Sequence, residues 1–188
     1  MRYKAIVIGT SYGGLDALKT ILPKLSYGFP LPVIIVLHIG SNNNDIFVKY
    51  LNSMCKLHVK EAECNEIIEK GFIYFAPPDY HLLIETDFTF SLTIDKKHNY
   101  SRPSIDILFE SAAWAYSKSL IGVVLTGANS DGAVGLKMIK DFGGMTLIQS
   151  PYSAMSPEMP RAALKIAEPE FRLKLEDIAD KLIELANY

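Results

Sequence analysis

The sequence has few of the features that mark secreted, membrane-spanning or nucleic-acid-binding proteins. It contains only two cysteines, Cys55 and Cys64, whose spacing fits neither a CxxC motif nor a disulfide framework, so we expect reduced thiols. No apolar run approaches the roughly 20 residues that cross a bilayer, and no signal peptide precedes the first apolar segment. No run of lysine and arginine exceeds two residues, and the net charge is −2, which gives no support for a nucleic-acid partner. We therefore expect a soluble, cytoplasmic protein with no membrane insertion.

Length and composition are those of an ordinary globular protein. Of the 188 residues, 49% are hydrophobic and 21% are charged, without the composition of a disordered chain. This length favours one domain with one sizeable core. Because no repeat, low-complexity segment or linker interrupts the chain, residues 1–188 are predicted to form a single domain.

Short apolar segments alternate with helical patterns. Strands are predicted at 4–9, 32–37, 57–59, 73–75, 120–126 and 145–148, and helices at 13–25, 44–54, 103–117, 132–142, 157–166 and 175–186. Because the strands are apolar without alternation, both of their faces should be buried, as in a parallel sheet covered by helices. The prediction is an α/β fold with a doubly wound, mostly parallel sheet and helices on both faces.

One stretch departs from this alternation. Residues 81–94 contain two strand-like runs around Thr86-Asp87, which predicts an antiparallel hairpin near one edge of the sheet. Pro103 suits the first turn of the helix that follows, with Asp106 near its positive end.

The first strand leads into a glycine-containing turn that holds a serine. Gly9-x-Ser11-x-Gly13 has the spacing of a nucleophile elbow, and Gly9-x-Ser11-x-x-Gly14 is close to the phosphate-binding turn of a dinucleotide site. A dinucleotide site needs an acidic residue at the end of the second strand, but none occurs before Asp45. A Walker A motif is absent, and the histidines and cysteines lack ligand-like spacing. We expect neither a cofactor nor a metal.

Three polar residues follow the carboxyl ends of predicted strands. Ser11 follows the first strand, His38 the second, and Asp131 comes soon after the strand at 120–126. Such ends open on one edge of a right-handed parallel sheet, where ligands bind. A hydroxyl, an imidazole and a carboxylate supply a nucleophile, a general base and a group that orients the base.

Each of the three residues also has a purely structural interpretation. Ser11 could cap the first helix, His38 could be a histidine satisfied at a strand end, and Asp131 before Gly132 could start a helix. The combination of three strand ends with three suitable side chains favours a catalytic triad, in a chain order that differs from that of the α/β-hydrolases.

A series of segments forms a wider pattern. In order they are IGTSYGG, the strand-end His38, VKEAE, YFAPPDYHLLI, SRPSIDILFESAA, GVVLTGANSDGAVGL and EMPRAAL. In order and spacing they resemble the catalytic domain of chemotaxis protein-glutamate methylesterases, from about Ala5 to Leu164. RPSIDILF and LTGxxxDGAxG are the most specific segments.

The resemblance implies a doubly wound α/β fold and hydrolysis of γ-glutamyl methyl esters on the cytoplasmic helices of chemoreceptors; some members also deamidate glutamine. It places the catalytic residues at Ser11, His38 and Asp131. The oxyanion donors are expected to be backbone N–H groups, those of Tyr12 and Ala128.

The sequence departs from the family pattern near these residues. Tyr12 stands where Thr is common, Ile39-Gly40 replace Met-Pro after the histidine, and Gly127-Ala128-Asn129 replace GMG before the aspartate. These changes are expected to reshape the substrate groove and to leave the backbone donors in place. Many members carry an N-terminal receiver domain that controls the site; Met1 lies only a few residues before the first strand, so this regulator is expected to be absent or to lie outside this chain.

The expected reaction is ester hydrolysis through an acyl-enzyme, without a metal or an organic cofactor. Arg102 is a candidate contact for an acidic substrate helix, with a solvated surface arginine as the alternative. Two rival functions remain: an esterase or amidase of this fold with another substrate, and a docking module without catalytic activity.

Overall fold

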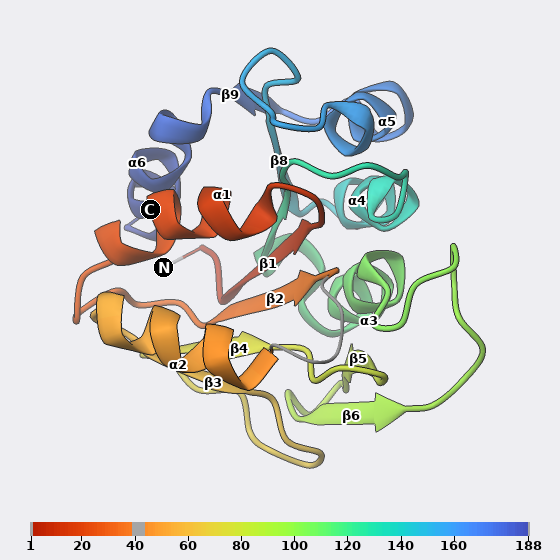
Figure 1. The fold of residues 1–188 in the computed structure, drawn as a ribbon. Coiled ribbons are helices and arrows are strands. Elements are labelled where there is room, and N and C mark those ends of the chain that lie inside the picture. The colour runs from red at the N-terminus through yellow and green to blue at the C-terminus, as the bar shows by residue number, and fades with distance from the viewer. Residues whose placement is uncertain (1, 39–43, 188) are drawn as a thin grey trace.

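The structure is a computed structural model that describes residues 2–38 and 44–187. Along the chain the elements are β1 (Ala5–Thr10), α1 (Gly14–Ile21), η1 (Leu22–Lys24), β2 (Val33–Leu37), α2 (Asn44–Met54), β3 (His58–Glu61), β4 (Phe72–Phe75), β5 (His81–Ile84), β6 (Phe90–Thr93), α3 (Ile105–Tyr116), η3 (Ser117–Ser119), β7 (Leu120–Val124), α4 (Ala133–Asp141), β8 (Met145–Gln149), α5 (Glu158–Ala167), β9 (Phe171–Leu173) and α6 (Leu175–Ala186) (Figure 1).

A parallel sheet forms the centre of the molecule. Its strand order is β3-β4-β2-β1-β7-β8-β9, and every neighbouring pair runs parallel. The chain extends the sheet from β1 in one direction and later crosses to β7 on the other side of β1. This reversal beside the central strand creates the crevice in which open α/β sheets bind ligands. The predicted doubly wound fold is confirmed.

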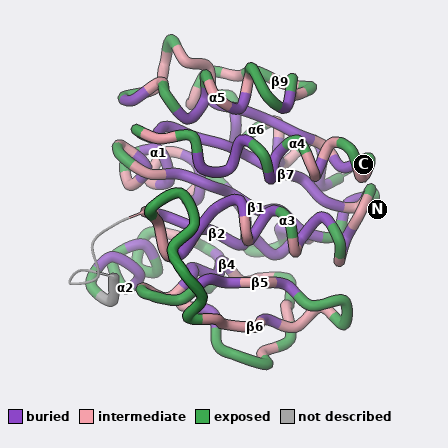
Figure 2. The backbone as a smooth tube through the Cα atoms, turned by 90° about the vertical axis from the view of Figure 1, so that its right-hand side faces the viewer, coloured by how far each residue is buried: buried purple, intermediate pink, exposed green. Residues whose placement is uncertain are grey.

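Helices cover both faces of the sheet. Figure 1 shows α1, α2 and α6 on one face and α3, α4 and α5 on the other. Within β1, Ile6 and Ile8 pack into the first core, whereas Ala5 and Val7 pack into the second. Because successive side chains of a strand point to opposite faces, a strand between two helical layers must be apolar throughout. The central strands are accordingly buried along their whole length (Figure 2).

The hairpin predicted at residues 81–94 is present as a separate two-stranded antiparallel sheet of β5 and β6. It packs on α3 and joins the second core through Leu82, Ile84 and Phe90. The ring of Phe90 lies 4.9 Å from that of Tyr74 in β4, so the hairpin lies near the β3–β4 edge, as expected.

Three sequence-based details were wrong. Pro103 does not enter the first turn of α3, because Ser104 is the N-cap and the helix begins at Ile105. The segment predicted as a helix at 13–25 changes to a 3-10 turn after Ile21. The edge strand β9 was not predicted, since its three residues are too few to show a pattern. In the described part of the chain, no helix is both long enough and apolar enough to span a bilayer.

Candidate active site

The three predicted residues lie at one edge of the sheet because their strands are neighbours. β1 pairs with β2 on one side and with β7 on the other. The N–H of Ser11 donates to the carbonyl of Thr126 (3.0 Å), and the N–H of His38 donates to the carbonyl of Thr10 (3.0 Å). The loops that follow β1, β2 and β7 are therefore held together by backbone hydrogen bonds beyond the strand ends.

A tight turn carries Ser11 from β1 into α1. Gly13, the N-cap of α1, has φ +79°, a conformation that favours glycine. A Cβ atom on Gly14 would lie only 2.5 Å from Oγ1 of Thr10, so this glycine lets the helix begin close to the strand. The Ser11 carbonyl accepts the N–H of Gly14, but among the described residues the Ser11 side chain makes no cap hydrogen bond. The proposed role of Ser11 as a side-chain cap is therefore not realised.

His38 and Asp131 come together. Nε2 of His38 lies 3.1 Å from Oδ2 of Asp131, and the Asp131 side chain is fully buried whereas that of His38 is 11% exposed. The two atoms are within ion-pair distance but lack the alignment of a hydrogen bond. Nε2 of the imidazole thus faces the buried carboxylate, and Nδ1 lies on the other side of the ring.

Asp131 also caps a helix, although not its own. Its Oδ2 accepts the N–H of Ile105 (2.7 Å), and its Oδ1 accepts the N–H of Asp106 (3.1 Å) and the hydroxyl of Ser104 (3.0 Å). Burial alone would raise the pKa of Asp131, but His38 and the N–H groups of α3 outweigh burial and lower it to about 2. The carboxylate is therefore ionised where it faces the imidazole of His38.

Asp106 performs the complementary task for α4. Its Oδ1 accepts the N–H groups of Gly132 (2.9 Å) and Gly135 (2.7 Å). Burial, reinforced by the charge of Asp131, raises the pKa of Asp106 to about 6. Asp131, just before α4, thus caps α3, and Asp106, in α3, caps α4, and this exchange fixes the position of Asp131. Sequence analysis placed Asp106 in the first turn of a helix and Asp131 after a strand, but it did not predict that the two would cap each other's helices.

Asn129 is a further polar neighbour of the imidazole, which we did not predict. Its Nδ2 lies 3.3 Å from Nδ1 of His38, and its Oδ1 accepts the N–H of Asp131 (3.1 Å). Sequence analysis noted Asn129 only as part of the segment that departs from the family pattern, and predicted no contact for it.

Ser11 lies beside the same loop without a bond to the imidazole. A Cβ atom on Gly127 would lie 2.9 Å from Cβ of Ser11, which shows how closely the loop after β7 approaches the serine. Among the described residues, no hydrogen bond joins the hydroxyl of Ser11 to His38. Ile39-Gly40, the predicted departure after His38, lie outside the described residues.

The two predicted oxyanion donors make no hydrogen bond within the part of the chain that the structure describes. Within residues 2–38 and 44–187, neither the N–H of Tyr12 nor that of Ala128 has a hydrogen-bond acceptor. The carbonyl of Gly127 accepts the N–H of Met159 (3.0 Å), and the carbonyl of Ser11 accepts that of Gly14 (2.8 Å). Since C=O and N–H point in opposite directions across a trans peptide, each donor is aimed away from the helix that anchors its peptide.

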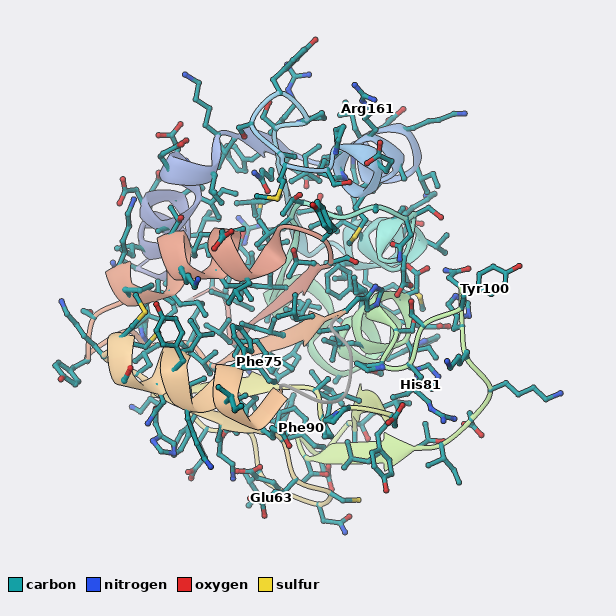
Figure 3. The ribbon with its side chains drawn as sticks, viewed as in Figure 1. Glu63, Phe75, His81, Phe90, Tyr100 and Arg161 are labelled. Atoms are coloured by element: carbon teal, nitrogen blue, oxygen red, sulfur yellow. The ribbon has the colours of Figure 1, made fainter. Side chains whose placement is uncertain are left out.

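The side chain of Arg102 makes hydrogen bonds to the protein's own backbone. Its Nη1 donates to the carbonyls of Ile94 (2.7 Å) and Asp95 (3.0 Å), which holds the loop after β6. The same loop carries Tyr100, whose side chain is 97% exposed and projects away from the body of the molecule (Figure 3). A contact between Arg102 and substrate stays a prediction.

His81, labelled in Figure 3, is a buried histidine with a structural role. Its Nδ1 accepts the N–H of Ser104 (3.1 Å), and its Nε2 lies 3.2 Å from the carbonyl of Lys96. Burial lowers the pKa of His81, so the neutral ring joins the hairpin to the start of α3.

Within the described part of the chain, one group of potential metal ligands lies together, namely His98, Asp106 and Asp131. Spacing along the sequence gave no sign of it. The carboxylate oxygens already accept N–H or O–H donors, including the side-chain amide of Asn99 at 3.1 Å from Oδ2 of Asp106. The carboxylate groups of both aspartates thus already have hydrogen-bond donors from the protein itself.

A pocket of about 340 Å³ adjoins the turn that carries Ser11. Gly13, Thr126 and Met155 border it, and Met155 is exposed, as is Tyr12 beside the serine. Among the described residues, the turn that carries Ser11 thus lies beside backbone donors without an acceptor and beside exposed apolar side chains.

The fold and this edge of the sheet define a class: doubly wound α/β proteins that present a hydroxyl, an imidazole and a buried carboxylate at the carboxyl ends of parallel strands, the residue types of a serine hydrolase. The chain matches the family model described as CheB methylesterase over residues 6–182. It therefore belongs to the CheB methylesterase family, whose members are carboxylic ester hydrolases.

Individual relatives agree with this assignment. A Leptospira interrogans protein named putative protein-glutamate methylesterase/protein-glutamine glutaminase is 51% identical over 185 residues, which are 98% of this chain and 96% of the relative. A protein-glutamate methylesterase/protein-glutamine glutaminase of Halalkalibacterium halodurans is 39% identical over 95% of this chain and 52% of the relative. The chain thus spans nearly all of the first relative and about half of the second.

A solved structure shows the same architecture. The crystal structure of the Thermotoga maritima CheB methylesterase catalytic domain matches with a TM-score of 0.94 and 34% identity. The match covers 98% of this chain and 100% of that one.

Proposed function

We propose that the protein is a cytoplasmic serine hydrolase of bacterial chemotaxis, which removes the methyl group from glutamate γ-methyl esters on chemoreceptor helices. The observation that carries the proposal is the pair of His38 and Asp131, 3.1 Å apart beside the turn that holds Ser11. The names of the relatives support the choice of glutamyl ester as substrate.

The distances support a separate role for each nitrogen of the imidazole. Nε2 of His38 faces Asp131, so Nδ1 is the nitrogen that accepts a proton from Ser11. The serine oxygen attacks the γ-carbonyl carbon as this proton moves to Nδ1, and Asp131 stabilises the imidazolium that forms. The imidazolium then gives the proton to the departing methoxide, methanol leaves, and an acyl-enzyme remains on Ser11. Water, deprotonated by the same nitrogen, releases the glutamate.

The N–H groups of Tyr12 and Ala128 stabilise the oxyanion of the tetrahedral intermediate. Their lack of an acceptor among the described residues supports this role, since a preorganised donor costs no rearrangement at the moment of reaction. Removal of one such donor costs on the order of 3 kcal/mol of transition-state stabilisation in other hydrolases.

The same acyl-enzyme can arise from glutamine with ammonia as the leaving group. The names of both relatives include glutaminase, and this favours deamidation as a second activity of the site.

The partner that we propose is a methylated cytoplasmic helix of a chemoreceptor. Control by a receiver domain or another regulator would come from outside this chain.

The test is the release of methanol from a methylated receptor cytoplasmic fragment by the parent protein and by Ser11→Ala. We expect the variant to keep the parent's circular dichroism spectrum and thermal transition and to lose methanol release by at least about 10³-fold, because the nucleophile is gone. Turnover within tenfold of the parent would contradict the proposal.

A matched serine variant and a second substrate sharpen this test. Ser26→Ala, at an exposed serine of the loop after η1, should release methanol like the parent. A simple alkyl ester should be hydrolysed much more slowly than the receptor fragment. Faster turnover of the simple ester would favour an esterase with another substrate.

A further inference from the structure

The proposed function gives Nδ1 of His38 a partner other than the one that it has in the structure. In the proposed function this nitrogen receives the proton of Ser11. In the structure it faces Nδ2 of Asn129 at 3.3 Å, and no hydrogen bond to the serine hydroxyl exists among the described residues. An unprotonated imidazole nitrogen has one lone pair in the ring plane, so it can accept only one good hydrogen bond at a time.

The orientation of the Asn129 amide follows from its other contact. Its Oδ1 lies 3.1 Å from the backbone nitrogen of Asp131, and that N–H can only donate. The oxygen must therefore face Asp131, which leaves the NH₂ group, a donor without acceptor capacity, facing His38. The NH₂ group is compatible with a lone pair on Nδ1 and incompatible with a proton there.

The opposite nitrogen of the ring gives the same tautomer. Nε2 faces the ionised, fully buried Asp131, and a carboxylate can only accept. The ring proton therefore lies on Nε2 and the lone pair on Nδ1. Asn129 and Asp131 thus hold the imidazole from two sides, and Asn129 occupies the nitrogen that performs the chemistry.

We propose that Asn129 is a positioning residue that holds the basic nitrogen of His38 in the free protein, and that Ser11 gains this nitrogen only when the amide releases it. The proposal rests on the proposed function for the role of Ser11, but the contact between Asn129 and His38 can be tested without it. Asn129 therefore lowers the reactivity of the serine in the absence of substrate, and displacement of its amide becomes a step of substrate binding.

Two substitutions at this position should act in opposite directions. Asn129→Gly removes the donor and leaves Nδ1 free for Ser11, so labelling of Ser11 by a serine-directed phosphonate should become about 3- to 10-fold faster, the equivalent of one hydrogen bond. Asn129→Asp keeps the acceptor for the N–H of Asp131 but faces Nδ1 with a carboxylate. It should hold a proton on Nδ1 and make labelling at least about tenfold slower.

The control is Ser130→Asp, which adds the same charge at the next residue, an exposed position. Labelling of this variant should stay within about twofold of the parent, since exposed charges interact weakly. If Asn129 only shapes the loop, Asn129→Gly and Asn129→Asp will change in the same direction. That result, or an Asn129→Gly variant no faster than the parent, overturns the proposal.

A spectroscopic measurement on the parent protein tests the proposal even if the Asn129 variants fail to fold. Long-range ¹H–¹⁵N spectra of the neutral His38 ring in the parent, assigned by comparison with His38→Gln, should show Nδ1 without a proton and Nε2 with one. A proton on Nδ1 in the parent overturns the proposal even if Ser11 is reactive. Conversely, a parent in which Ser11 cannot be labelled contradicts the proposed function and leaves this spectroscopic result standing.

Discussion

At the scale of single residues, Asp131 combines two tasks that are usually separate. One oxygen accepts a backbone N–H of α3 and lies against His38, and the other accepts a second backbone N–H and the hydroxyl of Ser104. His38 and the capping hydrogen bonds keep the buried carboxylate ionised, and in the proposed function this carboxylate orients the base. The structural interpretation, in which Asp131 starts α4, is replaced by a cap on α3, and the geometry is compatible with a role in a triad.

The change Asp131→Asn tests this double role. Only the oxygen of an amide can accept, so the NH₂ group of the variant must face N–H or O–H donors on one of its two sides. We expect kcat for methanol release to fall on the order of 10³–10⁴-fold and the free energy of unfolding to fall by about 1–3 kcal/mol. The measurements are receptor demethylation and urea unfolding.

A matched change separates the site from the general loss of a carboxylate. Asp141→Asn, in an exposed pair with Lys137 on α4, should alter stability by less than about 1 kcal/mol and leave kcat unchanged. An Asp131→Asn protein with more than a tenth of the parent's kcat would argue against the orienting role.

At the scale of elements, α3 and α4 are joined by exchanged caps. Asp106 of α3 accepts two N–H groups at the start of α4, and Asp131 before α4 accepts two at the start of α3. A carboxylate at a helix N-terminus satisfies unpaired donors and interacts favourably with the helix dipole. The two helices therefore fix each other's first turns, and through them the distance from Asp131 to His38.

This exchange predicts a pH dependence of stability. The pKa of Asp106 is raised to about 6 in the folded protein, above the value of about 4 expected in the unfolded chain. A raised pKa means that the folded state binds the proton more tightly, so the stabilisation is fully present below pH 4 and is lost as the pH rises through 6. Asp106→Asn does not titrate and should lack this decline.

The measurement is the free energy of unfolding of both proteins between pH 4 and pH 7. The advantage of the parent over Asp106→Asn should shrink with rising pH, by at most about 1.4 kcal/mol per pH unit. Asp16→Asn, on the exposed side of α1, controls for the loss of one carboxylate. A difference between parent and Asp106→Asn that stays constant over this range would contradict the account.

Elements with many apolar residues were predictable from sequence, and short or locally ambiguous ones were not. The helices at 44–54 and 175–186 have the predicted bounds, because their apolar periodicity extends over three turns. β9 pairs with β8 at the edge of the sheet and owes its conformation to this pairing, since three residues carry little local preference. The helix begins after Ser104 and not at Pro103, because the Ser104 hydroxyl accepts the N–H of Ile107 (3.4 Å) as an N-cap. A proline side chain has no acceptor for this N–H.

At the scale of the whole molecule, topology brings the site together. Ser11, His38 and Asp131 are distant in sequence, but β1, β2 and β7 are neighbours in the sheet and all run in the same direction. That placement could be predicted, because parallel strands deliver their carboxyl ends to one edge. The contacts of Asn129 and Asp106 could not, since they depend on the distance between loops and helix starts, which sequence spacing does not encode.

The most direct test of the central claim is the detection of an acyl-enzyme on Ser11. A methylated receptor peptide is mixed with the parent protein, quenched with acid within the first turnover, and the protein is analysed by peptide mass spectrometry. The account predicts that the receptor peptide is attached, through its glutamyl γ-carbonyl, to the enzyme fragment that contains Ser11. This adduct should form together with an equal amount of methanol and should be absent from Ser11→Ala. Methanol release without any adduct, and at the same rate in Ser11→Ala, would contradict it.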